Sequence, residues 1–413
     1  MIMKRIIMGI VMSILSEHMS ADTSQPIFKL GIENITDEVL HQVRGRRVGL
    51  ITNQTGRDQQ GRRTVDVLRN KGVHIQTLFV PEHGMHGEVA AEHDVHDIVD
   101  TKTGIPIISL YGKGTGKPLS ADTLKNIDVL MFDIQDSGMR HYTYIATLYH
   151  AIEAAAQHAR PLIVLDRPNP LGGVMEGPLV DPALRSFISI APIPLRHGMT
   201  VGELARYFTT LIKTPARLHV VPMIGYRRTH GLARTCVPTL SPNIQSHASC
   251  YGYSFLGLLG EVRPLDVGVG TPHAFQCITL AHDIQVPPTM WQTVREKLAH
   301  CGVHSAPHSY FNTRKKKKYV GLKINITDVH ELSSFAAFIT IVRMLKQAGV
   351  ALTFSKEFDK AVGSSHVRDF LMGQTPNLAQ LLATDLHRFC AQARSFYLYE
   401  PLPQVRSTLG ALL

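Results

Sequence analysis

Residue types that can do chemistry are densest in the stretch LFVPEHGMHGEVAAEHDVHDIVD, residues 78–100. It holds four histidines and six carboxylates in 23 positions. Its metal-like pairs are His83 with His86, Glu92 with His93, and His96 with Asp97. A zinc site needs three or four converging ligands, and the HExxH motif is absent, so we expect no metal here. Acid–base chemistry and a merely polar loop remain as the alternatives.

Glu82 is the strongest candidate in this stretch for proton transfer. It follows the apolar run LFVP, which is typical of the end of a strand. A carboxyl group at such a place could be partly desolvated, and burial raises the pKa of a carboxylic acid toward useful acid strength. His83 beside it could orient Glu82 or share its proton.

From about residue 28 the chain alternates apolar runs with helical patterns. Expected strands, with the turns that end them, cover 46–53, 74–84, 104–112, 127–136 and 160–173, and expected helices cover 62–72 and 141–159. Continuous apolar runs such as 129–132 and 162–165 indicate strands buried on both faces. Together with the intervening helices they predict an α/β fold with a doubly wound, Rossmann-like parallel sheet.

The expected domain order follows from where this regular pattern stops. Residues 28–195 form the predicted Rossmann-like domain, and 196–413 form a C-terminal α+β domain. The second part opens with a helix that Thr200 caps, with Glu203 three residues on as a capping box. Beyond it come less regular segments, including 218–226, 319–328 and the helix 333–349.

Polar side chains lie at the carboxyl ends of the five expected strands. In such sheets ligands bind outside the carboxyl ends of the strands. The residues at these ends are Asn53, Glu82, His83, Tyr111, Asp133, Asp136, Asp166, Arg167 and Asn169. Each alone could be a turn or a helix cap, but five strand ends together predict a site. No GxGxxG or phosphate-loop spacing is present, so neither NAD nor ATP is expected, and 113–117 is expected to be a mobile loop.

Composition narrows the class of protein further. The net charge is +10 and the pI is near 9.4, with five adjacent cations at 314–318. Aromatic content is only 7% and no stacking platform alternates with the cations, so nucleic acid is not an expected partner. The five cysteines show no zinc-like or framework spacing and are expected to be buried thiols, with at most one bridge.

The N-terminus resembles a targeting segment. Residues 1–27 run from a basic start through ten apolar residues, IIMGIVMSIL, to a small polar stretch. That order is typical of a short secretory signal, and a buried first helix is the alternative. The apolar run is too short for a permanent membrane anchor. We therefore expect a secreted or periplasmic protein.

Nearly the whole chain from residue 28 resembles the bacterial exo-β-N-acetylmuramidases, which remove terminal N-acetylmuramic acid (MurNAc) from peptidoglycan fragments. The motifs that carry the resemblance are GLITNQTG (49–56), LFVPEHGMHGE (78–88), TGIPIISLYG (103–112), DVLMFDIQDSGMRHYTYI (128–145), VLDRPNPLGG (164–173), EGPLVDP (176–182), PIPLRHGMTVGELA (192–205) and LSPNI (240–244). The resemblance implies a cleft between the two domains and no cofactor. It also implies Glu82 as the key catalytic residue and Tyr142 or Tyr144 as the assisting tyrosine.

Glycoside cleavage needs a proton on the leaving oxygen and stabilisation of an oxocarbenium-like centre. Asp133 or Asp136 could supply the second carboxylate, unless the acetamido group of the substrate acts as the nucleophile. Candidate substrate-binding residues are Asn53, Asp136, Asp166, Asn169 and Asn243, together with Arg140, Arg167 and Arg196 as clamps for the lactyl carboxylate. Each of the arginines could instead be a structural ion-pair partner.

One segment departs from the family pattern. Family members carry a stretch similar to EGTNLSEGRGTTRPFE where this chain has EVRPLDVGVGTPHAFQ, residues 261–276. Both family arginines are replaced, by Val269 and His273. The favoured function is still a glycoside hydrolase acting on a peptidoglycan-derived sugar. The alternative is a non-catalytic muropeptide-binding protein, and an oxidoreductase ranks third because the phosphate-binding glycines are missing.

Overall fold

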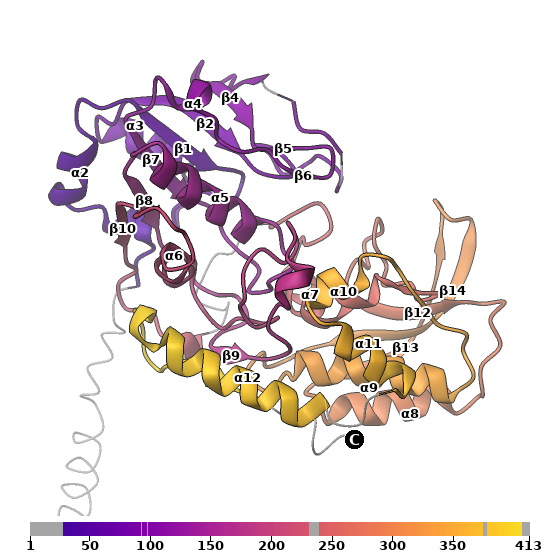
Figure 1. The fold of residues 1–413 in the computed structure, drawn as a ribbon. Coiled ribbons are helices and arrows are strands. Elements are labelled where there is room, and N and C mark those ends of the chain that lie inside the picture. Colours follow the sequence, from indigo (N-terminus) through magenta and orange to yellow (C-terminus); the bar gives the residue numbers. More distant parts are fainter. Residues whose placement is uncertain (1–27, 92, 97, 231–238, 375–377, 407–413) are drawn as a thin grey trace, which may run out of the picture.

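The fold is given by a computed structural model, which describes residues 28–91, 93–96, 98–230, 239–374 and 378–406. The expected signal segment, 1–27, therefore lies outside the described residues. Figure 1 shows two halves: a sheet with flanking helices in indigo to magenta, and a second group of elements in salmon to yellow. No helix in the described residues is long and apolar enough to span a membrane.

The first half is built on a sheet that has seven strands in the described part of the chain. Its order is β10 (Leu218–Val221), β8 (Leu162–Leu165), β7 (Val129–Asp133), β1 (Val48–Thr52), β2 (Ile75–Val80), β4 (Pro106–Ser109) and β3 (Ile98–Val99). All neighbouring pairs are parallel except β3 with β4. The predicted α/β fold with a doubly wound parallel sheet is confirmed, except that the sheet is mostly parallel: the short antiparallel edge strand β3 was not anticipated.

Side chains on both faces of this sheet are buried, as the continuous apolar runs predicted. In β7, Val129 and Met131 pack on one face, while Leu130 and Phe132 pack on the other. The first face is covered by α2 (Asp37–Val43) and α3 (Thr64–Asn70). The second is covered by α5 (Tyr144–Gln157) and α6 (Val201–Thr209), with the short α4 (Ala121–Leu124) beside them. Burying both faces leaves the strand ends as the place where polar groups can gather.

The start of α6 and the segment 113–117 were both assigned local structures from the sequence. Thr200 caps α6, and its side chain accepts a hydrogen bond from the backbone N–H of Glu203 at 3.3 Å, which confirms the capping box. Part of the loop expected at 113–117 is a strand, while the mobility expected there stays a prediction. β5 (Tyr111–Gly112) and β6 (Thr115–Gly116) form a hairpin, because Lys113 and Gly114 take positive φ angles of 53° and 70° that suit a two-residue turn.

The second half contains a three-stranded antiparallel sheet in the described residues, with the order β12 (Cys277–Ala281), β14 (Lys317–Asn325) and β13 (His304–Asn312). Its helices are α7 (His247–Leu259), α8 (Met290–Ala299), α9 (Ser334–Gln347), α10 (Phe358–Val362), α11 (Ser365–Met372) and α12 (Leu378–Ala393). The lysine run lies where β13 turns into β14. There Lys317 pairs with Asp283.

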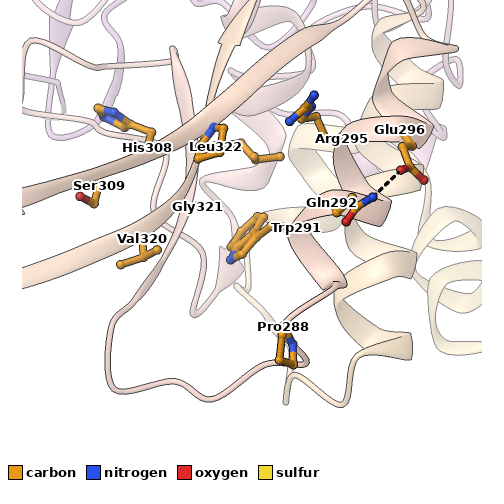
Figure 2. Close-up of a pocket in the computed structure, with 11 residues that line it drawn as sticks. Pro288, Trp291, Gln292, Arg295, Glu296, His308, Ser309, Val320, Gly321 and Leu322 are labelled. Carbon is orange, nitrogen blue, oxygen red and sulfur yellow. Dashed lines mark hydrogen bonds between the residues drawn. The ribbon is translucent and has the colours of Figure 1, made fainter.

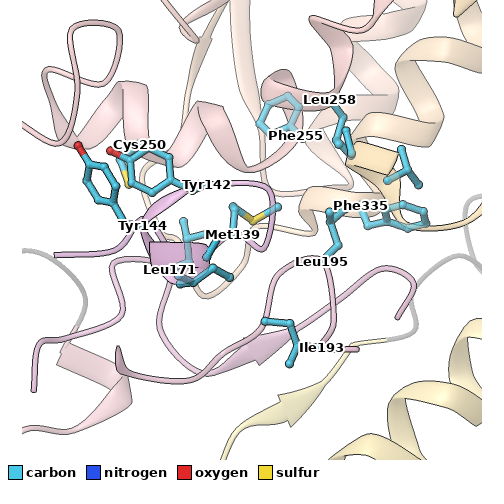
Figure 3. Close-up of a cluster of buried hydrophobic side chains, with 14 of the residues drawn as sticks. Met139, Tyr142, Tyr144, Leu171, Ile193, Leu195, Cys250, Phe255, Leu258 and Phe335 are labelled. Carbon is cyan, nitrogen blue, oxygen red and sulfur yellow. The ribbon is translucent and has the colours of Figure 1, made fainter. Parts of the chain in front are cut away.

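The two halves share one apolar cluster. Figure 3 shows Tyr142 and Tyr144 of the first half beside Cys250 of α7, and Leu195 beside Phe335 of α9. Short strand pairs complete the second half and its join to the first: β11 (Val262–Arg263) with β15 (Thr353–Phe354), and β9 (Val174–Met175) with β16 (Gln404–Val405). Single 3₁₀ turns lie at η1 (Gly31–Asn34), η2 (Pro182–Leu184), η3 (Arg228–His230) and η5 (Arg394–Phe396).

The edge strand β10 belongs to the first sheet although it follows residue 195, where the sequence pattern places the change of domain. It pairs in parallel with β8 over Leu218–Val221. The C-terminal chain also returns to the first half, where the Tyr399 hydroxyl donates to Asp166 at 2.6 Å. The domain boundary between residues 195 and 196 therefore stays a prediction.

Candidate active site

Glu82 lies where β2 ends, and its carboxyl group is buried against the start of α5. Glu82 is 7% exposed, and its Oε2 accepts a hydrogen bond from the Thr143 hydroxyl at 2.8 Å. Thr143 is the N-cap residue of α5, and its side chain makes no capping bond to its own helix. The carboxyl group therefore lies at the end of the helix where backbone N–H groups carry partial positive charge, which favours an anion.

His83 holds an unusual backbone conformation directly after Glu82. Its φ angle is 71°, a left-handed region that costs a non-glycine residue free energy. Its Nδ1 lies 2.6 Å from the carbonyl oxygen of Val89, and the residue is 6% exposed. Such conformations persist only where the surroundings hold them, and they are common at functional sites. The loop therefore fixes the direction in which Glu82 leaves the strand.

Tyr142 and Tyr144 form an aromatic wall next to Glu82. Both hydroxyls donate to the backbone carbonyl of Leu240, at 2.9 and 3.0 Å, and the rings are 4.6 Å apart. Burial raises the pKa of both phenols, and the nearby Glu82 carboxylate adds to the rise for Tyr144. Each phenol therefore stays neutral at physiological pH and acts as a hydrogen-bond donor, not as a base.

The second half contributes Tyr253 of α7 to the same wall. Its ring lies 5.7 Å from Tyr142 and 4.7 Å from His141. Burial raises the pKa of the Tyr253 phenol, and the charges of Glu82 and Asp136 add to the rise, which places both carboxylates near its hydroxyl. Sequence reasoning missed Tyr253, because nothing in the segment around it distinguishes a wall residue from a core residue.

Several buried polar atoms in this region have no hydrogen-bond partner among the described residues. They are Asn53 Nδ2, Gln54 Oε1, Asp136 Oδ1 and both ring nitrogens of His141. Burial, and then the charge of Arg140, lower the pKa of His141 to about 3, so its ring is neutral. An unpaired buried polar atom costs about 1–3 kcal/mol, so a group of them is a reason to expect a polar ligand or solvent there.

Gln54, Thr143 and the Leu240 carbonyl also belong to the site, although sequence reasoning did not name them. The side-chain nitrogen of Gln54 donates to the carbonyl oxygens of Thr239 and Leu240, at 3.1 and 2.9 Å. Gly87 has a positive φ of 70°, and a Cβ added there would lie 2.3 Å from the Gln54 side chain, so a larger residue would displace the Gln54 amide. The only available signal was that Gln54 and Thr143 stand inside the motifs GLITNQTG and RHYTY.

The two candidates for a second carboxylate differ in what they bind. Asp133 is fully buried; it accepts from Arg167 Nε at 2.5 Å and Nη2 at 2.8 Å, and from the hydroxyl of Thr64. Asp136 uses only Oδ2, which accepts from the backbone of Gly138 at 2.6 Å and lies 3.1 Å from His197 Nε2. Both oxygens of Asp133 are therefore occupied by the protein, whereas Oδ1 of Asp136 is not.

The three candidate arginine clamps are all buried and all hydrogen-bonded within the protein. Arg140 donates to carbonyl oxygens of Pro178, Ile193 and Val362, and to the hydroxyl of Ser189. Arg196 pairs with Glu176 at 2.8 Å and donates to three carbonyl oxygens, those of Leu171, Val329 and Leu332. Arg167 holds Asp133. These bonds favour the structural role for the three arginines over the role of substrate clamp.

The asparagine candidates and Asp166 also bond to the protein. Asn169 accepts from the backbone of Leu171 at 2.8 Å, which forms a turn, and it donates to the distant carbonyl of Met199 at 2.9 Å. Asn53 Oδ1 accepts from the backbone and the hydroxyl of Thr55. Asn243 accepts from the backbone of Gly270 at 3.2 Å, and so connects LSPNI to the divergent segment 261–276. Asp166 joins the ends of β8, α6 and the C-terminal chain.

The histidine-rich stretch shows no metal-like arrangement where the structure describes it. Glu92 and Asp97 lie outside the described residues, and His86 is exposed. No group of three or more His, Cys, Asp or Glu side chains among the described residues could hold a metal ion. Glu82 is thus the residue of this stretch that lies beside the aromatic wall.

Two models of one protein family match consecutive parts of the chain. Residues 48–248 match the N-terminal model, and residues 251–399 the C-terminal model, of the exo-β-N-acetylmuramidase NamZ family. The chain belongs to the NamZ family.

Related proteins cover nearly the full length of the chain. A Bacillus subtilis (strain 168) protein, the peptidoglycan β-N-acetylmuramidase NamZ, is 34% identical over an alignment of 387 residues. The match covers 91% of this chain and 92% of that protein. Two crystal structures of DUF1343 family proteins from Bacteroides fragilis NCTC 9343 have TM-scores of 0.80 and 0.71, with 32% and 26% identity. Each match covers 90% of this chain and 99% of the solved chain. They share the two-part fold described above.

The buried carboxyl group of Asp166 predicts a specific pH dependence of stability. Burial, which outweighs the Tyr399 hydrogen bond, raises its pKa from 3.8 to about 6. The folded state then holds a proton that the unfolded state has lost, so the free energy of unfolding should fall as pH rises from about 4 to 6. For a shift of about two units the fall is up to about 3 kcal/mol.

Asp166→Asn should remove this contribution while keeping the hydrogen bonds, because the hydroxyls of Thr200 and Tyr399 can also accept. We expect the difference in unfolding free energy between pH 4 and pH 7, measured by urea denaturation, to be smaller in the variant. Asp122→Asn, at an exposed position in α4, is the charge-matched control. Equal pH dependence in the wild type and Asp166→Asn would contradict the assignment.

Proposed function

We propose that this chain is an exo-β-N-acetylmuramidase that releases terminal MurNAc from peptidoglycan fragments, with Glu82 as its acid/base. The observation that carries the proposal is the placement of Glu82: a buried carboxyl group held by Thr143 beside neutral phenols and unpaired polar atoms. Membership of the NamZ family and the activity of the Bacillus subtilis relative support the choice of reaction.

Glu82 and a second carboxylate have separate roles in this mechanism. Glu82 gives its proton to the leaving oxygen as the glycosidic bond breaks, while positive charge develops on the sugar ring. Asp136 is the better partner of the two aspartates, because Oδ1 is not used by the protein, whereas Arg167 and Thr64 occupy Asp133. Asp136 either stabilises the ring or orients the substrate's acetamido group.

The neutral donors around Glu82 bind the substrate and fix its orientation. Asn53 Nδ2 has no partner in the described residues and can donate to a sugar hydroxyl or to the acetamido oxygen. Tyr142, Tyr144 and Tyr253 give the wall an apolar surface with polar tips, which suits a sugar ring. Asn243 and segment 261–276 border this wall, since Gly270 binds Asn243 and the Phe275 ring lies 4.9 Å from Tyr253.

Replacing the proposed acid tests the reaction directly. Glu82→Gln should lower kcat on a chromogenic MurNAc glycoside by about 10²–10⁴-fold, because the amide has no proton to give. The matched control is Glu88→Gln, an exposed glutamate of the same loop, which should retain wild-type activity. Full activity in Glu82→Gln would contradict the mechanism. A wild-type protein that binds the sugar without releasing the chromogen would favour the non-catalytic muropeptide-binding alternative.

A second variant tests the aromatic wall. Tyr144→Phe removes a hydroxyl near Glu82 and keeps the ring, so kcat/KM should fall by about 10–100-fold, the value of one hydrogen bond near a charge. The control is Tyr149→Phe, on the same helix, where the ring packs on Phe208 at 5.4 Å. If both variants lose activity equally, the effect is one of stability and the assignment of Tyr144 is wrong.

We also propose that the protein acts outside the cytoplasm. The support is the basic, apolar and then small polar order of residues 1–27. We expect cell fractionation with mass spectrometry of the N-terminus to find a mature form that starts after the apolar run. Recovery of a full-length form in the cytoplasm alone would contradict this proposal.

A further inference from the structure

A cavity of about 620 Å³ lies in the second half, between α8 and the sheet β12–β14–β13. Val320 and Leu322 of β14 line it on the sheet side, and Trp291 lines it from α8. Figure 2 shows Trp291 between Pro288 and the strand that carries Gly321 and Leu322. Its volume is that of a small-molecule site, and it shares no lining residue with the wall around Glu82.

Trp291 is the only tryptophan of the chain, and it is only partly buried. It packs against the apolar core of the second half and also lines the cavity. A tryptophan ring buries a large apolar area and carries a flat π face. The fold therefore presents part of a flat aromatic surface to the cavity instead of covering it.

Polar groups surround this aromatic surface. The Gln292 side-chain nitrogen donates to Glu296 at 3.0 Å, which fixes both side chains on one face of α8. Arg295, from the same helix, forms no ion pair or hydrogen bond within the part of the chain that the structure describes. Ser309 adds a hydroxyl from β13. The aromatic ring of Trp291 is thus flanked by a cationic donor, Arg295, by an anionic acceptor, Glu296, and by neutral polar groups.

We propose that this cavity binds one or two pyranose units of a glycan chain. A pyranose ring has apolar C–H faces and a rim of hydroxyl groups, so one face lies on Trp291 while the rim bonds to planar side chains such as Arg295 and Gln292. The alternatives fit less well: an acyl chain makes no use of the polar groups of Arg295 and Gln292, and a phosphate would meet Glu296 beside Arg295. The inference does not rest on the proposed hydrolysis, because binding needs no turnover.

Intrinsic fluorescence tests the proposal, because all tryptophan emission of this protein comes from this cavity. We expect titration of the full chain with N,N′,N″-triacetylchitotriose to change the intensity or wavelength of emission saturably, with a Kd of about 1 mM or tighter. Xylitol, which has hydroxyls but no ring, is the ligand control and should produce no saturable change. The absence of a saturable response to the trisaccharide would overturn the proposal.

Variants of exposed rim residues separate this site from the catalytic one. Arg295→Ala should weaken the fluorescence-detected affinity by about 5–30-fold, the cost of a charge-assisted hydrogen bond. Hydrolysis of a soluble chromogenic MurNAc glycoside should stay unchanged, and Glu82→Gln should leave the fluorescence titration unchanged. The matched control is Arg388→Ala, an exposed arginine of α12. Wild-type trisaccharide affinity in Arg295→Ala would contradict the assigned site even if hydrolysis is confirmed.

Discussion

Three side chains converge on one backbone oxygen, the carbonyl of Leu240, and the arrangement of the candidate active site depends on this convergence. The hydroxyls of Tyr142 and Tyr144 and the carboxamide of Gln54 all donate to it, at 2.9–3.0 Å. They come from the start of α5 and from the loop after β1, whereas Leu240 precedes α7. The bonds therefore connect the sheet edge to the second half, and they hold the tyrosine rings beside Glu82.

Charge in the first half is divided between structural and chemical use. Three buried ion pairs have a structural role, and each of their arginines also donates to backbone carbonyl oxygens: Arg167 with Asp133, Arg196 with Glu176, and Arg228 with Glu203. Removing one partner of such a pair leaves an uncompensated buried charge, which is strongly destabilising. The carboxyl group of Glu82 differs from these pairs in accepting a hydrogen bond from the neutral hydroxyl of Thr143.

The second half contributes to both of the proposed sites. Through α7 and segment 261–276 it completes the wall around Glu82, and through α8 it carries a separate cavity with Trp291. A site for a glycan chain away from the cleaved bond raises the local concentration of chain ends, because binding at one place makes encounter at the other intramolecular. This relation joins the two proposals, although each is tested independently.

The sequence by itself determined the sheet, the position of Glu82 and the polar strand ends, because burial on both faces demands continuous apolar runs and expels polar groups to the ends of parallel strands. It also indicated the family, through motifs in a fixed order. Only the tertiary structure decided what each polar residue does: it paired Asp133 with Arg167, surrounded Arg140 and Arg196 with carbonyl oxygens, and left Asp136 with an unused oxygen. It alone brought Tyr253 to Glu82 from about 170 residues away, because contacts across a domain junction depend on packing and have no local periodicity.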